Sequence, residues 1–148
     1  MKPIPPTIAF LQNPWFPPDT RKEAIDRYTT DQDFHRRLLG TTMSGRRLRQ
    51  AFGDVVYGQI HWDNVAPAAS HIASGVTEVD MLHVERSMAR VKPIIILTFG
   101  VIARDALKNS IYGAQTKMFH CHHPNARHKT LSDLQQFALR VQQYVDSL

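Results

Sequence analysis

The densest group of chemically useful side chains lies between residues 120 and 129. It comprises His120, Cys121, His122, His123, Pro124, Asn125, Ala126, Arg127, His128 and Lys129. So many ligand types suggest a metal site, but neighbouring residues of a strand point to opposite faces, and the sequence has no second cluster to complete four ligands. We therefore expect no metal. A nucleophilic cysteine–histidine pair is also disfavoured, because nothing in the sequence indicates an activated Cys121 thiol.

Anion recognition is the interpretation of this segment that we favour. A histidine at the end of a strand can stabilise negative charge, and Arg127 and Lys129 can bind phosphates or enter a duplex. Three further cations gather on one predicted helix face, and for these a solvated surface is the ordinary alternative. They are Arg46, Arg47 and Arg49.

Two more segments carry amide and aromatic side chains, and each follows a predicted strand. In the first, Asn13 can hold a water or a carbonyl, and Trp15 and Phe16 offer flat faces for a planar ligand. In the second, the Asn64 amide presents a donor beside an acceptor, which suits the edge of a pyrimidine. The alternatives are a turn with its aromatic rings folded onto the core, and an Asx-turn at a strand end that involves Asn64.

These segments need a scaffold, and hydrophobic patterning predicts one. We predict strands over residues 7–11, 55–62, 94–99 and 117–121. We predict helices over about 21–28, 44–53, 77–91 and 101–108, and one from about residue 130 onward. Ser44 resembles an N-cap, whereas Thr77 with Asp80, and Thr130 with Asp133, resemble the starts of helices. Residues 31–42 give no clear pattern.

Alternation of strands with helices predicts one α/β domain over residues 1–148. We expect a three-layer α/β/α sandwich on a mainly parallel sheet of four strands. The unbroken apolar run at residues 94–99 is typical of a strand covered on both faces. Ligands of such folds lie outside the carboxyl ends of the strands, so the three chemical segments should meet at one edge.

Composition narrows the function classes. The chain has 148 residues, of which 43% are hydrophobic, so a disordered chain is excluded. Its single cysteine excludes an internal disulfide and an all-cysteine iron–sulfur site. Its apolar stretches are too short to span a bilayer, and no apolar region of a signal peptide follows the first residues, so we expect a soluble, cytoplasmic protein. The net charge of +5 favours an anionic partner such as nucleic acid, with plain solubility as the alternative.

Taken in order, the segments resemble the uracil-DNA glycosylase superfamily. Residues 12–16, Gln-Asn-Pro-Trp-Phe, look like its first motif, Gly-Gln-Asp-Pro-Tyr-His, in which the mismatch-specific and single-strand-selective branches carry Asn for Asp. Asn64 stands where the second strand delivers a pyrimidine-reading Asn. Residues 123–127, His-Pro-Asn-Ala-Arg, are similar to His-Pro-Ser-Pro followed by a wedge residue. The sequence departs from the pattern at Leu11, Trp15 and Asn125.

The resemblance implies a monomeric, cofactor-free DNA glycosylase that removes a flipped pyrimidine and leaves an abasic site, in base-excision repair or in attack on phage DNA. It implies catalytic roles for Asn13, which would place the water, and His123, which would stabilise the leaving base. The implied substrate-binding residues are Gln12, Trp15, Phe34 and Asn64, with Leu38 or Leu39 as alternatives to Phe34 for stacking on the base. The implied DNA-binding residues are Asn125, Arg127 and Lys129.

The sequence is compatible with two other functions. One is a nucleic-acid-binding module of the same fold without catalysis, and the other is an unrelated α/β enzyme acting on a nucleotide or another small anion. Within the glycosylase interpretation, the base is uracil, a 5-substituted uracil or a modified cytosine.

Overall fold

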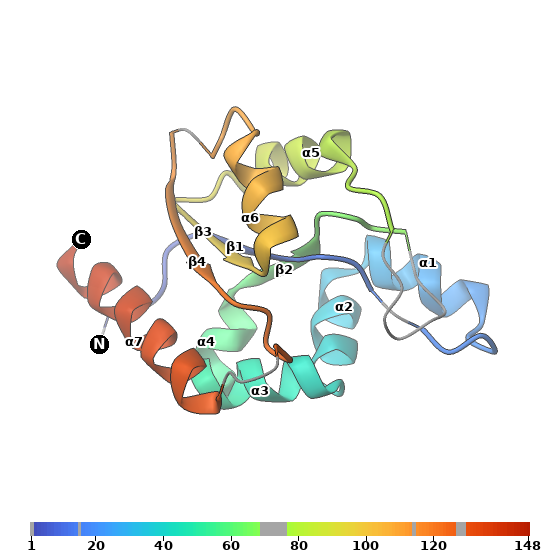
Figure 1. Ribbon diagram of the computed structural model, residues 1–148, viewed down its shortest axis with the longest axis horizontal. Helices are drawn as coiled ribbons and strands as arrows, with labels where there is room; N and C mark the ends of the chain where they lie inside the picture. Colours follow the sequence, from blue (N-terminus) through green and yellow to red (C-terminus); the bar gives the residue numbers. More distant parts are fainter. Residues whose placement is uncertain (1, 15, 69–76, 114, 127–129) are drawn as a thin grey trace.

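The chain folds around a sheet of four parallel strands, seen in the computed structural model in Figure 1. The strands are β1 (Thr7–Leu11), β2 (His61–Asn64), β3 (Ile95–Phe99) and β4 (Lys117–Cys121). Their order in the sheet is β2-β1-β3-β4. The structure describes residues 2–14, 16–68, 77–113, 115–126 and 130–148.

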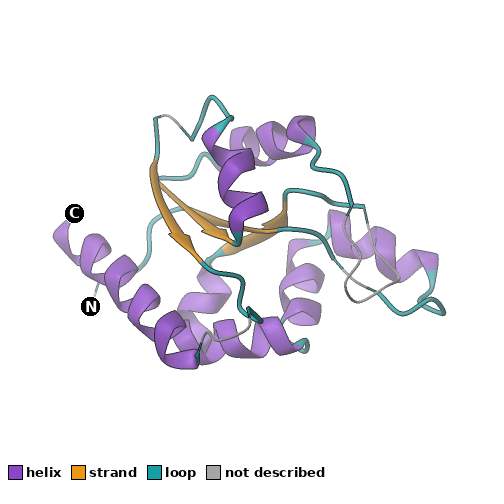
Figure 2. Ribbon diagram, viewed as in Figure 1, coloured by secondary structure: helices purple, strands orange, loops and turns teal. Residues whose placement is uncertain are grey.

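Helices cover both faces of this sheet (Figure 2). The helices α5 (Met81–Val91) and α6 (Val101–Lys108) lie on one face. The helices α3 (Met43–Phe52), α4 (Asp54–Gln59) and α7 (Leu131–Ser147) lie on the other. The helices α1 (Lys22–Thr30) and α2 (Gln32–Leu39) pack against each other on the β2 side. The predicted α/β architecture with helices flanking a parallel sheet is confirmed.

Two hydrophobic cores follow from the pleat of the strands, because successive side chains point to opposite faces. On β3, Leu97 and Phe99 pack with α3, α4 and α7, whereas Ile96 packs with α5 and α6. Every residue of β3 is buried, as the unbroken apolar run predicts for a strand covered on both sides.

The second strand is where the sequence prediction is wrong. Residues 55–62 are rich in β-branched and aromatic side chains, yet residues 54–59 form α4 and the strand begins only at His61. The positive φ of Gly53, 82°, turns the chain between α3 and α4. Within α4 Tyr57 is buried, Val56 is half-buried and Val55 is exposed, so burial does not alternate along these residues as it would in a half-buried strand.

The sequence predicts where the helices lie better than it predicts the residues at which they begin. The N-cap of α3 is Thr42, whose side chain accepts the Gly45 N–H, and not Ser44. Helix α5 begins after Asp80, which accepts the His83 N–H, so Thr77 is not part of its cap. The capping box of Thr130 and Asp133 at α7 is confirmed. None of the described helices is long and apolar enough to cross a bilayer.

Candidate functional site

The carboxyl ends of all four strands lie at one edge of the sheet, so the three chemical segments begin at that edge. Leu11 pairs with Asn64 in the register of β1 and β2, and the Ala66 N–H donates to the Gln12 carbonyl at 2.8 Å. On the other side, the Gly100 N–H donates to the Cys121 carbonyl at 2.9 Å. Because the strands are parallel, this convergence is what the sequence predicts.

The segment after β1 places Asn13 and Gln12 half-buried at this edge. The Asn13 side-chain amide donates to the Pro14 carbonyl at 3.3 Å. Phe16 is buried, and its ring packs edge-on against Tyr28 with the centroids 5.2 Å apart. Phe16 therefore follows the alternative prediction of a turn whose aromatic rings fold onto the core, and its ring does not offer a face to a ligand. Trp15 lies outside the described residues.

The loop after β4 fixes the tautomer of His123. The Asn125 backbone N–H donates to His123 Nδ1 at 3.1 Å, so this nitrogen is an acceptor and carries no proton. Burial lowers the pKa of His123 below its ordinary value, and the neighbouring His122 lowers it further. The ring is therefore neutral at pH 7 and holds its one proton on Nε2.

Two contacts hold this loop in place. Arg47 on α3 donates from its guanidinium to the Pro124 carbonyl at 2.8 Å. Gly100 begins α6 with a φ of 91°, and a Cβ built on it would lie 3.8 Å from the Cβ of His123. His123 therefore sits beside the start of α6. Asn125 is exposed, and Arg127 and Lys129 lie outside the described residues.

Asn64 lies beside a small cavity. The residue is only 5% exposed, and within the described part of the chain its side-chain amide makes no hydrogen bond. The cavity, of about 10 Å³, is lined by Tyr28, Thr29, His35, Asp63, Asn64, Pro67 and His83. This volume is about what the centre of one water molecule needs.

A buried carboxylate supports the strand end that carries Asn64. Asp63 Oδ1 accepts from His83 Nε2 at 2.8 Å and from the Asn64 N–H at 2.8 Å, while Oδ2 accepts from Ser87 Oγ at 2.5 Å. Burial raises the pKa of Asp63, but the hydrogen bonds from His83, Ser87 and the Asn64 N–H outweigh it, so the pKa lies below its ordinary value. The hydrogen bond to Asp63 raises the pKa of His83 against the opposing effect of burial.

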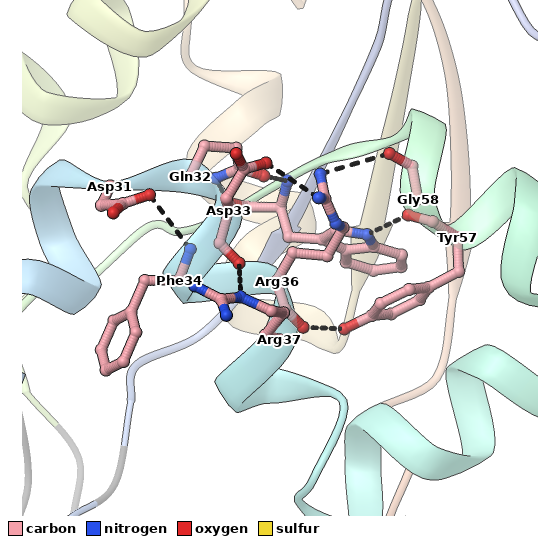
Figure 3. Close-up of polar contacts among 9 residues, drawn as sticks. Asp31, Gln32, Asp33, Phe34, Arg36, Arg37, Tyr57 and Gly58 are labelled. Carbon is pink, nitrogen blue, oxygen red and sulfur yellow. Dashed lines mark hydrogen bonds and ion pairs between the residues drawn. The ribbon is translucent and has the colours of Figure 1, made fainter.

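The structure does not bring Phe34 to this cavity. The Arg27 guanidinium lies 4.4 Å from the centre of the Phe34 ring, and Figure 3 shows that ring pointing away from Tyr57. Its neighbour His35 lines the cavity instead and stacks on Tyr28, with centroids 3.8 Å apart. Of the two alternatives, Leu39 is buried in the core and Leu38 is half-buried.

Hydrogen bonds tie helix α2, which carries His35, to β2, which carries Asn64, and to α4 (Figure 3 shows the contact of Arg36 with Tyr57). The Gln32 side chain accepts the Trp62 N–H at 2.7 Å and donates to the Trp62 carbonyl at 2.9 Å. The Tyr57 hydroxyl donates to the Arg36 carbonyl at 2.7 Å. The side chain of Gln32 thus completes the hydrogen bonding of the edge strand.

The sequence does not single out four of the residues that line the cavity, namely Tyr28, His35, Asp63 and His83, nor Ser87, which bonds Asp63. A charged Asp63 directly before Asn64, at the end of a buried strand, is the signal that could have been used, because a buried carboxylate requires donors. Its partners lie 20 and 24 residues further along the chain, so the sequence gives no local indication of them.

The histidine-rich segment divides between the two faces of β4. His120 Nδ1 lies 3.1 Å from the Thr98 hydroxyl, whereas Cys121 is buried in the core under α7. In the part of the chain that the structure describes, no three potential ligands group around a metal position. A comparison with models of known protein families finds no match, and no curated protein has a sequence similar to this chain.

Proposed function

We propose that this protein is a DNA glycosylase, which hydrolyses the N-glycosidic bond of a flipped pyrimidine and leaves an abasic site. The observation that carries the proposal is His123, a neutral ring with its proton on Nε2, at the sheet edge that also carries Asn13 and Asn64. The placement of all three motifs after parallel strands supports the proposal, since the resemblance to the uracil-DNA glycosylase superfamily rests on these motifs in this order.

The reaction needs a donor because the leaving base becomes an anion while the sugar becomes an oxocarbenium-like cation. A neutral His123 donates from Nε2 to the base carbonyl that gains this charge. One such preorganised donor contributes about 3 to 4 kcal/mol of transition-state stabilisation in a site that excludes water.

Asn13 holds the attacking water in this mechanism. Its amide has a donor and an acceptor but no titratable group, so it positions the water without accepting a proton from it. We therefore expect a slower enzyme than one with a carboxylate at this position.

Asn64 reads the base through its amide, and Asp63 fixes the backbone from which that amide extends. The base must leave the helical stack, which costs a few kcal/mol. Because the cavity beside Asn64 holds about one water, entry of a base also requires the lining to open. The net charge of +5 favours the DNA backbone, with Arg127 and Lys129 as the proposed contacts and Asn125 beside them.

A panel of modified-base oligonucleotides tests the proposal. Incubation with wild-type protein should create abasic sites, measured as alkali-sensitive breaks, and Asn13→Ala should abolish them while binding of DNA is retained. Arg127→Ala should slow base release from duplexes more than from single strands, because only a duplex leaves a gap to fill.

The small size of the cavity favours a second candidate, a nucleic-acid-binding module of the same fold without catalysis. DNA binding without abasic sites on any oligonucleotide of the panel would establish this alternative and contradict the glycosylase proposal.

A further inference from the structure

His35 carries a buried nitrogen that lacks a partner. The residue is 4% exposed, and its Nδ1 lies 3.0 Å from the Tyr28 carbonyl oxygen. Because a carbonyl only accepts, Nδ1 holds the proton and donates. Burial lowers the pKa of His35 to about 4, so the ring is neutral at pH 7 and Nε2 presents a lone pair. No described residue donates to this nitrogen, whose surface is buried.

The tautomer of His35 is fixed. Moving the proton to Nε2 would set the Nδ1 lone pair against the Tyr28 carbonyl and break the hydrogen bond between them. Stacking on Tyr28 restricts the ring as well. His35 therefore offers an acceptor and no donor at Nε2, and a buried acceptor without a partner destabilises the folded protein.

The same cavity is lined by Asn64, whose amide has no hydrogen-bond partner in the described part of the chain. The volume of about 10 Å³ suits a water molecule or a group of similar size, such as an amino group. The cavity thus combines a fixed acceptor with an amide that can present either its oxygen or its nitrogen.

We propose that this cavity takes the exocyclic amino group of a 4-amino pyrimidine, that is, a cytosine-type base. One N–H of the amino group donates to His35 Nε2, and the other donates to the Asn64 side-chain oxygen. The inference rests on the proposed function, since it names the class of base that the glycosylase site selects.

His35 rather than Asn64 makes the choice between base classes. The Asn64 amide can rotate to match either a 4-amino or a 4-oxo pyrimidine, because it has one donor and one acceptor group. A 4-oxo base such as uracil would direct a carbonyl lone pair at the lone pair of His35 Nε2. Sites built to bond a substrate donor reject analogues that lack it, because their buried polar groups are then left without a partner.

The experiment compares 5-hydroxymethylcytosine and 5-hydroxymethyluracil in one oligonucleotide sequence. These bases differ at C4, which carries an amino group or a carbonyl, and at N3, which carries a hydrogen only in the uracil form. For the wild-type protein we expect kcat/KM for base release to be at least about tenfold higher with the cytosine form. His35→Phe keeps an aromatic ring beside Tyr28 but removes the acceptor, so the preference should fall by about tenfold. His61→Phe, the same change at a histidine outside the cavity lining, should keep the preference.

A binding measurement separates this inference from the proposed function. The same oligonucleotides with a 2′-fluoro sugar resist cleavage, and their dissociation constants should show the same preference for the cytosine form and its loss in His35→Phe. If the binding preference and its loss in His35→Phe are observed but no base is released, the assignment of the cavity is supported and the glycosylase proposal is contradicted.

Two outcomes would overturn the inference. One is release or binding of the uracil form that equals or exceeds the cytosine form. The other is a preference that His35→Phe leaves unchanged, which would mean that a group other than His35 selects the base.

Discussion

The hydrogen bond from the Asn125 N–H to His123 Nδ1 determines which ring nitrogen carries the proton. A backbone donor is suited to this role, since it depends on the conformation of the loop and not on the Asn125 side chain. The burial that lowers the pKa of His123 keeps the ring neutral, so its Nε2–H is present before any base binds. Such preorganisation is what makes a donor effective on a developing anion.

The tautomer of His123 is directly measurable. Long-range ¹H–¹⁵N spectra at pH 7 should show that His123 is protonated at Nε2 and unprotonated at Nδ1. An Nδ1–H tautomer, or an imidazolium at this pH, would contradict the role given to this ring.

The ion pair of Asp63 and His83 predicts a pH-dependent stability. The folded-state pKa of His83 is raised, so the stabilisation that the pair provides is complete below the unfolded pKa of about 6.5 and is lost as the pH rises through the folded value. We expect a loss of about 1 kcal/mol in the free energy of unfolding, since the ring is partly exposed.

His83→Gln is the matched control, because its amide donates to Asp63 at every pH. Chemical denaturation between pH 5 and pH 9 should show that the free energy of unfolding of the wild-type protein, relative to that of this variant, falls as the pH rises. Burial lowers the pKa of His35 and His123 and so increases the stability of both proteins with pH, a contribution that cancels in the difference. A difference that stays constant with pH would show that His83 does not contribute the expected dependence.

At the scale of elements, helix α3 matters because Arg47 holds the loop that carries His123. The neighbouring Arg46 donates to the Thr42 carbonyl within its own turn and makes no hydrogen bond to the described residues of the loop. Within the basic face predicted from the sequence, Arg47 thus makes a hydrogen bond that can position this loop. A small displacement of a catalytic group can cost an order of magnitude or more in rate.

This difference between two adjacent arginines yields a prediction. Arg47→Ala should lower kcat about tenfold with little change in KM, and Arg46→Ala should leave kcat unchanged. If both variants instead weaken DNA binding equally and spare kcat, the face is an electrostatic contact and Arg47 has no positioning role.

The sequence predicts most elements and only part of the site, and the reasons are physical. A strand that is covered on both faces, such as the one predicted at residues 94–99, can be predicted from its continuous apolar sequence alone. Helix α4 cannot be predicted in this way, because its β-branched residues become helical only through the turn at Gly53 and the burial of Tyr57. His35 was missed for a similar reason, since its role depends on stacking against the preceding helix.

At the scale of the molecule, a parallel sheet collects polar side chains from distant parts of the chain at one edge. Asn13, Asn64 and His123 come from segments that follow three different strands, and because the strands are parallel these segments all start at the same edge. The two hydrophobic cores hold the strands from both faces, so the site edge rests on a rigid base. Short motifs that are poor evidence of a site when taken singly form a better candidate site when the fold places them at a common edge.

The positive net charge predicts how DNA binding responds to salt. If about three phosphates are neutralised, raising the salt from 50 to 200 mM should weaken binding about 40-fold, with a logarithmic slope of about −2.7. Titration of a fluorescent oligonucleotide at several salt concentrations measures this slope. A slope near zero would contradict backbone binding by Arg127 and Lys129.

The most direct test compares wild-type protein with His123→Ala in single-turnover release of a modified pyrimidine. We expect base release by the wild-type protein, a rate about 10² to 10³ lower in the variant, and DNA affinity unchanged within about twofold. Equal rates in the two proteins would contradict the central role of the His123 Nε2–H.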